Sequence, residues 1–210
     1  MKTERSRLRR LHQRGHYDHE SIYQVLDAGR QCSVGYVFKS TPYVTPTTHW
    51  REGNQVYWHG SSASQMLRAA NGADVCLTVA ILDGYVMARS GMHHSVNTRS
   101  VMLFGRAEKV PDELKEAKMK NMVKGLFPGR WDILRPATKQ EIKATTILSM
   151  EIDEGSAKIR TGAPGDDEED YALPIWAGVI PVRTVVDAPI DDPRNLPEMT
   201  PPDHILAFRG

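Results

Sequence analysis

A strand that runs into a serine-rich turn is the segment of this sequence best suited to bind a ligand. Residues Val56–Gln65 read VYWHGSSASQ, and the pattern predicts a helix start with a capping box that begins at Ser62. Free N–H groups at a helix start, together with the hydroxyls of Ser61, Ser62 and Ser64, can bind a phosphate. Plain helix capping explains the same residues equally well. The run holds no Lys or Arg, so Arg68, one turn further on, would have to supply the cation that a phosphate normally requires.

A second group of polar residues stands at the entrance of an apolar strand. The sequence HHSVNTRS leads directly into the apolar run VMLFG. The members of interest are His94, Ser95, Asn97, Arg99 and Ser100. Burying them costs hydration free energy unless they bind a polar ligand or one another. The pattern favours a binding site, with Arg99 as a second candidate cation, over the alternative of a self-contained hydrogen-bonded rim.

An aromatic segment towards the C-terminal end reads PIWAGVIP. Trp176 is followed by Ala177 and Gly178, which are small enough to let the backbone approach a flat group. The indole could therefore stack on a ligand, although a tryptophan in such a run is more often part of the hydrophobic core.

Sequence motifs for several common chemistries are absent. The chain contains no GxGxxG, GxxxxGK[ST], HExxH, CxxC or GxSxG pattern, which removes motif support for nucleoside triphosphatases, zinc proteases and serine hydrolases. The eight histidines show no ligand spacing, and the adjacent His93 and His94 would point to opposite faces of a strand. We therefore expect no metal site. Cys32 and Cys76 lie in separate apolar runs and read as two buried, reduced thiols.

Composition narrows the class of protein further. The 210 residues include 27 Lys and Arg against 26 Asp and Glu, and this net charge of +1 argues against a nucleic-acid partner. No window reaches the roughly 18 apolar residues of a membrane-spanning helix. The basic start of the chain lacks the apolar core of a secretory signal. We expect a cytoplasmic protein without a membrane segment.

Short apolar runs separated by turn signals predict a mainly β fold with inserted helices. Strands are expected at 32–38, 43–51, 55–60, 74–82, 99–108 and 148–152, the last pairing with either 157–160 or 180–186, and helices at 21–29, 66–70 and 111–127. Pro46 lacks a ladder donor, so its strand should lie at an edge or carry a bulge. The nearly continuous apolar run 74–82 suggests cover on both faces. These elements favour an α+β chain built on one antiparallel β-barrel or sandwich.

The ends of the chain differ in composition from its centre. Residues 1–18 form a basic N-terminal arm, 19–187 the β domain, and 188–210 a tail rich in Pro and Asp. The acidic run at 166–170 is expected in a solvated loop.

Seven stretches carry a resemblance to a known family. They are YWHGSSAS from Tyr57, VCLTV from Val75, VMARS from Val86, HSVNTRSVMLFGRAE from His94, PGRW from Pro128, SAKIRTG from Ser156 and WAGVIP from Trp176. In this order they resemble the pyridoxamine 5′-phosphate oxidase-like family. Within it they are most similar to the flavin-nucleotide-binding branch related to nitroimidazole-resistance proteins. Each stretch alone is weak evidence, whereas the ordered set is specific.

The resemblance implies an antiparallel split β-barrel that forms a homodimer and binds one flavin mononucleotide (FMN) per subunit at the dimer interface. The residues that it assigns to the cofactor are Thr45, Thr47, Ser61, Ser62, Ser64, Thr78, Asn97, Arg99, Ser100 and Trp176. The serines would hold the phosphate, and the backbone of 44–48 and Thr78 would line the ring and ribityl chain. Trp176 would close the site from the partner subunit.

Two functions follow from the resemblance. One is an FMN-dependent oxidoreductase that passes electrons or hydride to a small aromatic, nitro or quinone-like acceptor, with His59 or His94 as a proton donor. The other is a non-catalytic carrier or sensor that binds a flavin, heme or deazaflavin. Oxidases that act on the vitamin carry an Arg-Lys pair where this chain reads Ser64-Gln65-Met66, which argues against the vitamin as substrate.

Overall fold

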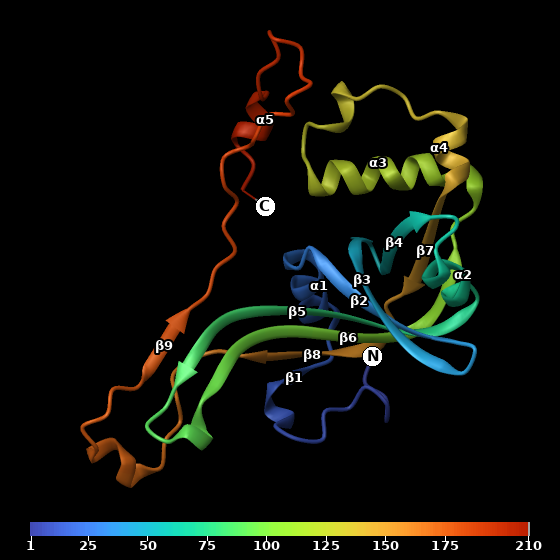
Figure 1. Ribbon diagram of the computed structural model, residues 1–210. Coiled ribbons are helices and arrows are strands. Elements are labelled where there is room, and N and C mark those ends of the chain that lie inside the picture. Colours follow the sequence, from blue (N-terminus) through green and yellow to red (C-terminus); the bar gives the residue numbers. More distant parts are fainter. Residues whose placement is uncertain (210) are drawn as a thin grey trace. The chain divides into compact units, whose positions relative to one another are not determined.

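The computed structural model describes residues 1–209, and its central element is an antiparallel sheet of nine strands (Figure 1). The strands are β1 (Gly15–His16), β2 (Gln31–Phe38), β3 (Thr41–Glu52), β4 (Gln55–Ser61), β5 (Ala73–Met87), β6 (Ser95–Lys109), β7 (Thr145–Glu151), β8 (Glu154–Arg160) and β9 (Gly178–Pro181). Their order is β1-β8-β6-β7-β4-β3-β2-β5-β9, and a further pairing of β5 with β6 closes β2 to β7 into a barrel. The antiparallel β-barrel with inserted helices is confirmed.

Short helices interrupt the strands. The α-helices are α1 (His19–Ala28), α2 (Gln65–Ala70), α3 (Lys115–Leu126), α4 (Lys139–Ala144) and α5 (Asp203–Leu206), and the 3₁₀ turns are η1 (His12–Arg14), η2 (Gly91–His93), η3 (Asp112–Leu114), η4 (Trp131–Ile133) and η5 (Glu168–Ala172). Within residues 1–209, none of these helices is long and apolar enough to cross a lipid bilayer.

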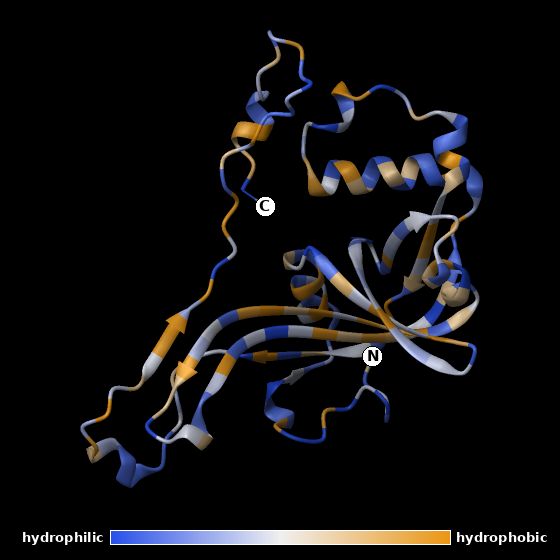
Figure 2. Ribbon diagram, viewed as in Figure 1, coloured by the Kyte–Doolittle hydropathy of each residue, from blue (hydrophilic) through white to orange (hydrophobic). Residues whose placement is uncertain are grey.

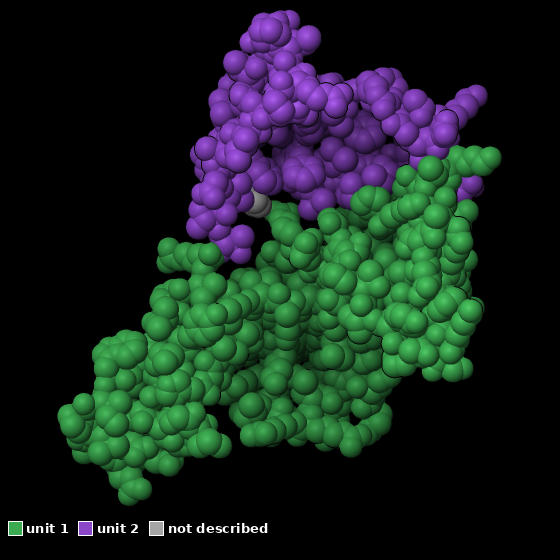
Figure 3. All heavy atoms as spheres, in the orientation of Figure 1, with its two compact units in different colours: residues 1–110, 143–183 green, residues 111–142, 184–210 purple. Residues whose placement is uncertain are grey.

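The chain divides into two compact units (Figure 3). Residues 1–110 and 143–183 form one unit, which contains all nine strands of the described chain together with α1 and α2. Residues 111–142 and the chain from Thr184 onward form the other, in which the ring centroids of Phe127 and Phe208 lie 5.7 Å apart. Every residue singled out above as a ligand or catalyst belongs to the unit that contains the sheet.

Alternation of side chains on β5 and β6 builds one wall of the barrel core. The register places Leu77 beside Leu103 on the inward face, where both are fully buried, and Thr78 beside Met102 on the outward face. Figure 2 shows the hydrophobic residues distributed along both strands. The expectation that 74–82 is covered on both faces is wrong for the single chain, because its outward positions from Cys76 onward are only partly buried or exposed.

The strand at 145–151 pairs differently from either option predicted from the sequence. β7 pairs with β4 along its length and with the end of β6, whereas β8 pairs with β6 and β1, and β9 pairs with β5. The buried residues explain the register, since Leu148 lies beside Trp58 and Met150 beside Val56. A one-residue slip would turn these four side chains towards the opposite face.

Candidate functional site

β3 and β4 part close to the serine-rich turn. Their pairing extends from Glu52 and Gln55 to His49 and Trp58 and then stops. Beyond that point Thr41–Thr48 pairs only with β2, and His59–Ser61 pairs only with β7, among the strands of residues 1–209. Each segment therefore keeps one edge whose backbone groups are free of ladder hydrogen bonds and can bind a ligand.

The expected position of Pro46 is confirmed by the same pairing. Pro46 lies opposite Ser33 of β2, on the part of β3 that has no second neighbour. A proline is tolerated there because an edge strand loses no ladder bond on its open side.

The serine turn is arranged differently from the capping box predicted by the sequence. Ser64, not Ser62, caps α2, and its Oγ accepts from the N–H of Leu67 at 3.5 Å. The Ser62 N–H donates to the carbonyl of Ala144 at 2.8 Å, and the Ser64 N–H to that of Ser61 at 2.9 Å. Because protein carbonyls take these N–H groups, the exposed hydroxyls of Ser61 and Ser62 remain for a ligand, and the Ser61 Oγ also accepts from the N–H of Ala63 at 3.2 Å.

Arg68 places a guanidinium at this turn. Its Nε donates to the carbonyl of Ser62 at 3.0 Å, and the residue is exposed. This contact uses Nε alone, so the two terminal nitrogens of the guanidinium can contact an anion beside the serine hydroxyls. Arg68 is thus the cation whose position agrees with the sequence argument for a phosphate.

His59 stands on the open segment of β4. Its ring makes an edge contact with Trp50, with 6.0 Å between centroids. Desolvation by burial lowers the pKa of His59 below its usual value, so the imidazole is neutral at neutral pH. Its Nδ1 is buried and finds no hydrogen-bond partner among the described residues. A neutral, unpartnered imidazole is suited to hydrogen-bond a ligand or to bind a metal ion.

The three threonines of the predicted site do not share one face of the sheet. Thr45 and Thr47 lie beside Val34 and Cys32 on the inward side. Thr78 lies beside Ser33, on the outward side. The structure thus brings Thr45 and Thr47 towards the open edge of β3 and leaves Thr78 on the outer wall.

The predicted residues of β6 form a separate group. Arg99 donates to both carboxylate oxygens of Asp83, at 2.7 and 2.8 Å, so its charge is already balanced. The Ser100 hydroxyl donates to the carbonyl of Lys158 at 3.3 Å, and His94 is exposed with its Nδ1 2.9 Å from the carbonyl of Ser90. These contacts fit the alternative of a hydrogen-bonded rim better than that of a phosphate site.

Asn97 leads to a residue that the sequence argument missed. Asn97 is 8% exposed, and its amide donates to the carbonyl of Gly162 at 3.1 Å and accepts from Arg160. Arg160 lies 63 positions further along the chain, and β8 brings it beside β6. Its presence in the stretch SAKIRTG was the only signal in the sequence.

Trp176 lies before β9 and is 69% exposed. A Cβ added at Gly178 would come within 2.8 Å of the indole, so the ring lies directly on that glycine. Gly178 therefore accommodates the indole of Trp176 on one side, and the other side of the ring stays available to a ligand. β9 pairs with the end of β5, far along the sheet from β3 and β4.

Comparison with known proteins assigns the family. The model of the pyridoxamine 5′-phosphate oxidase family matches residues 18–159. The chain belongs to this family. No curated protein matches the chain.

Three solved structures illustrate how this oxidase-family chain compares with others. The flavocytochrome Anf3 from Azotobacter vinelandii is 50% identical, with a TM-score of 0.94 over 99% of this chain and 97% of the other. The FAD and heme binding protein from Mycobacterium smegmatis is 33% identical, with a TM-score of 0.90 over 94% and 98%. A proposed 5-nitroimidazole antibiotic resistance protein from Bacteroides thetaiotaomicron, 19% identical with a TM-score of 0.55 over 69% and 86%, shares the fold.

One loop of this oxidase-family barrel is held by a buried carboxylate. The Asp166 side chain is 0% exposed and accepts from the backbone N–H of Arg89 at 2.8 Å and from its guanidinium at 2.9 Å. The expectation of a fully solvated acidic loop is therefore wrong at this position. His93 and Asp170 lie near Asp166 at metal-ligand spacing, but the guanidinium of Arg89 already supplies the cation there.

Replacement of Asp166 by asparagine is expected to release the loop over 162–172, because the Arg89 guanidinium loses its counter-charge. Trypsin should cleave the chain after Arg160 several times faster in Asp166→Asn than in wild type. The exposed neighbour Asp167 provides a matched control, and Asp167→Asn should leave the cleavage rate unchanged. Equal rates in wild type and Asp166→Asn would contradict the assignment.

The same ion pair predicts a pH dependence. Burial raises the pKa of Asp166, but hydrogen bonds from Arg89 outweigh it and hold the pKa below the ordinary value of 3.8. The pair therefore stabilises the loop at every pH above that ordinary value and is lost as the pH falls through the lowered pKa. A pepsin digest in that acid range should cleave the loop of wild type as fast as that of Asp166→Asn.

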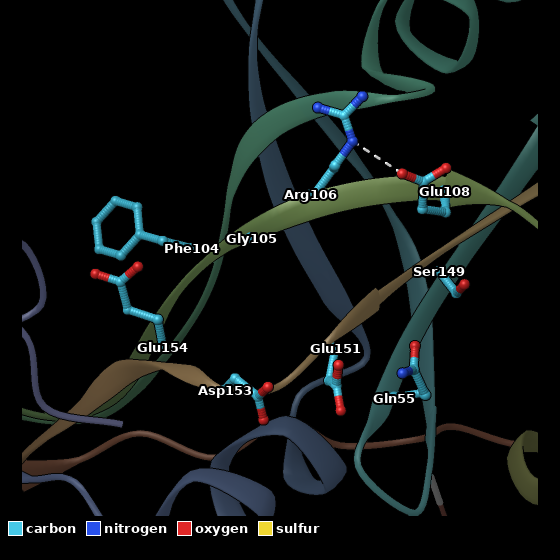
Figure 4. Close-up of a pocket in the computed structure, with 9 residues that line it drawn as sticks. All are labelled: Gln55, Phe104, Gly105, Arg106, Glu108, Ser149, Glu151, Asp153 and Glu154. Carbon is cyan, nitrogen blue, oxygen red and sulfur yellow. Dashed lines mark hydrogen bonds and ion pairs between the residues drawn. The ribbon is translucent and has the colours of Figure 1, made fainter.

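A pocket of about 530 Å³ lies elsewhere on the barrel, between β6, β7, β8 and the start of β4 (Figure 4). Its residues are Gln55, Phe104, Gly105, Arg106, Glu108, Ser149, Glu151, Asp153 and Glu154. Four of them are carboxylates, with Arg106 paired to Glu108 at 2.9 Å. None of the ligand residues predicted from the sequence lines it, and its negative charge disfavours a phosphate.

Proposed function

We propose that this protein is a flavin-binding electron-transfer protein of the oxidase family, with the flavin held along the parted edges of β3 and β4. The observation that carries the proposal is the meeting of a serine turn, a guanidinium and open strand edges at one place. Ser61, Ser62 and Arg68 would bind the phosphate, and the free backbone groups near Thr45 and Thr47 would hydrogen-bond the ring. Bound flavin supplies hydride or single-electron chemistry.

The flavin is proposed to be FAD, with FMN as the alternative, and a heme is proposed in addition. The 50% identical relative is named a flavocytochrome and the 33% identical one an FAD and heme binding protein. A neutral imidazole is a common ligand of heme iron, and His59 is the proposed ligand because burial keeps its ring neutral and it lies on the open segment of β4. His49 is neutral for the same reason, but it is only 2% exposed and its Nε2 lies 2.9 Å from the carbonyl of Leu26, so a heme could reach it less easily.

The visible absorption spectrum of the purified full chain tests this proposal. We expect two flavin bands and a Soret band, and chromatography of the acid-released flavin should give FAD. Failure to retain FAD or FMN after reconstitution and desalting would refute the flavin site. Release of FMN alone would refute FAD, and the absence of a Soret band after reconstitution with hemin would refute the heme.

The function of the bound flavin is proposed to be reduction of a small aromatic, nitro or quinone-like acceptor. The proposal rests on the exposure of the Ser61 and Ser62 hydroxyls and on the open backbone edges of β3 and β4, where a second molecule could approach the ring. Steady-state reduction by a reduced nicotinamide should exceed the rate with free flavin. A rate no higher than that of free flavin would favour the carrier or sensor alternative.

A second copy of the chain is proposed to cover the outer wall of the barrel. Met102 is 44% exposed beside Thr78 on β5 and β6, and Val44 of β3 is 70% exposed on the same outward face. The candidate ligand residues lie in two groups, one at β3 and β4 and one around Trp176 and the end of β5. Two copies packed through this wall could bring the Trp176 of one subunit to the serine turn of the other.

Introducing a charge on this wall is expected to separate the subunits. Light scattering of wild type should give twice the 23.6 kDa of one chain, and Met102→Glu should give a single chain, because an unpaired carboxylate would be buried in the interface. Met92→Glu, at an exposed turn outside the sheet, is the control and should keep the dimer. A monomeric wild type would contradict the proposal.

A further inference from the structure

Arg160 carries a charge that nothing in the described chain balances. Its Nη1 donates to the Asn97 side chain and, at 3.4 Å, to the carbonyl of Gly162, and its Nη2 donates to the carbonyl of Ala163 at 3.2 Å. Its Nε is buried and makes no hydrogen bond to any of residues 1–209. All of its partners are neutral oxygens, so the guanidinium is hydrogen-bonded but not neutralised.

A second arginine makes this shortage of negative charge larger. The pKa of Arg160 lies below its usual value, first because burial desolvates the guanidinium and second because Arg14 lies close to it. Arg14 ends η1, just before β1 pairs with β8, and Lys158 lies opposite Gly15 in that pairing. The two arginines therefore lie close together where β1 and β8 meet the 162–163 turn, and Lys158 lies two residues before Arg160 on β8.

Three carboxylates on or next to the strands and loop around Arg160 are already paired with other residues. Glu154, at the start of β8, binds Arg5 and Thr3. Asp83 binds Arg99, and Asp166 binds Arg89. Within residues 1–209, neither Arg14 nor Arg160 has an ion-pair partner. Like charges held together and partly desolvated cost free energy unless an anion joins them.

We propose that Arg14 and Arg160 form a subsite for the anionic group of a ligand, a carboxylate or a phosphate. Arg160 is the preorganised member, because Asn97 and the turn carbonyls fix its orientation and leave the buried Nε unused. Arg14 approaches from the N-terminal arm and adds the second positive charge. The subsite is separate from the serine turn, because that turn follows β4, and β8, β6 and β7 lie between β1 and β4 in the sheet order.

Two ligands of the proposed function carry such a group, and naming the source rests on that function. Heme offers propionate carboxylates. A flavin nucleotide offers phosphate, which would then lie here instead of at the serine turn. The subsite itself needs only the anion, so it can be tested without either cofactor.

Calorimetric titration of the cofactor-free full chain with inorganic pyrophosphate tests the subsite directly. Arg14→Gln should weaken pyrophosphate binding by about tenfold or more, the usual effect of losing a charged contact. Arg160→Lys keeps the positive charge but removes the planar guanidinium, so it should weaken pyrophosphate binding by a smaller factor. Arg14 donates no side-chain hydrogen bond to residues 1–209, so the Gln variant should fold even if changes at Arg160 disturb the turn. Arg9→Gln, an exposed cation of the same arm, is the matched control.

Two further comparisons identify the source of the anion. If it is a phosphate, Arg14→Gln should weaken FAD and leave riboflavin unaffected. If it is a propionate, the variant should weaken heme and leave the dimethyl ester of heme unaffected. If Arg14→Gln loses pyrophosphate binding but wild type retains neither FAD nor heme, the subsite is supported and the proposed function is refuted. A wild type that binds no pyrophosphate, or equal affinities in wild type, Arg14→Gln and Arg9→Gln, would overturn the subsite.

Discussion

Gly155→Ala is expected to lower the free energy of unfolding by about 3 kcal/mol, the upper end of the usual cost of overpacking. Gly155 is the second residue of β8 and lies opposite Leu103 in the antiparallel pairing of β8 with β6. A Cβ there would lie 2.6 Å from Leu103 Cδ2 and 2.7 Å from the carbonyl oxygen of Met102. The leucine could rotate, but the carbonyl belongs to the β6 backbone, so the strands themselves would have to move apart.

Urea unfolding of the two glycine variants measures this effect. Gly165→Ala is the matched control, because a Cβ there meets no heavy atom within 4 Å. It should change the free energy of unfolding by less than about 0.5 kcal/mol. A similar stability for Gly155→Ala and Gly165→Ala would show that β8 can shift to make room, and would contradict the close approach of Gly155 to the β6 backbone.

Arg68→Gln is expected to weaken FAD binding by roughly 10- to 100-fold, because a phosphate would lose its charged partner at the serine turn. Riboflavin, which has no phosphate, should bind wild type and variant equally well. Fluorescence quenching titrations of both ligands separate the phosphate contact from contacts to the ring.

Arg106→Gln supplies the control for this experiment. Arg106 is an exposed cation of the same barrel, but it pairs with Glu108 in the acidic pocket, away from the serine turn. Its replacement should leave both affinities unchanged. If Arg68→Gln retains the affinity of wild type for FAD, the phosphate does not lie at the serine turn.

The sequence predicted the local parts of the site well. The apolar alternation placed β2 to β6 and α1 to α3 within a few residues, and the proline in β3 correctly marked an edge. These features depend on neighbours in the chain, where side-chain periodicity and turn chemistry act directly. The sequence pattern predicted Ser62 as the cap of α2, whereas Ser64 caps it, since several neighbouring serines fit the same pattern.

Charge pairing could not be predicted in the same way, because it depends on which strands meet. Arg99 looked free in the sequence, but a register shift between Leu82 and Gly84 accompanies the ion pair that Asp83 makes with it. Arg160 and Asn97 come together only because β8 adds to the outer side of β6. The sequence thus identified polar residues at the right strands and assigned the unbalanced charge to the wrong arginine.

The open edge of β3 also bears on how the protein behaves when its ligand is missing. An unpaired strand edge can recruit a strand from another molecule and begin aggregation. Pro42 and Pro46 lie within this edge and cannot donate hydrogen bonds to an incoming strand. The same segment that leaves backbone groups available to a ligand is therefore a poor template for intermolecular sheet growth, so the empty chain should remain dispersed long enough to be loaded.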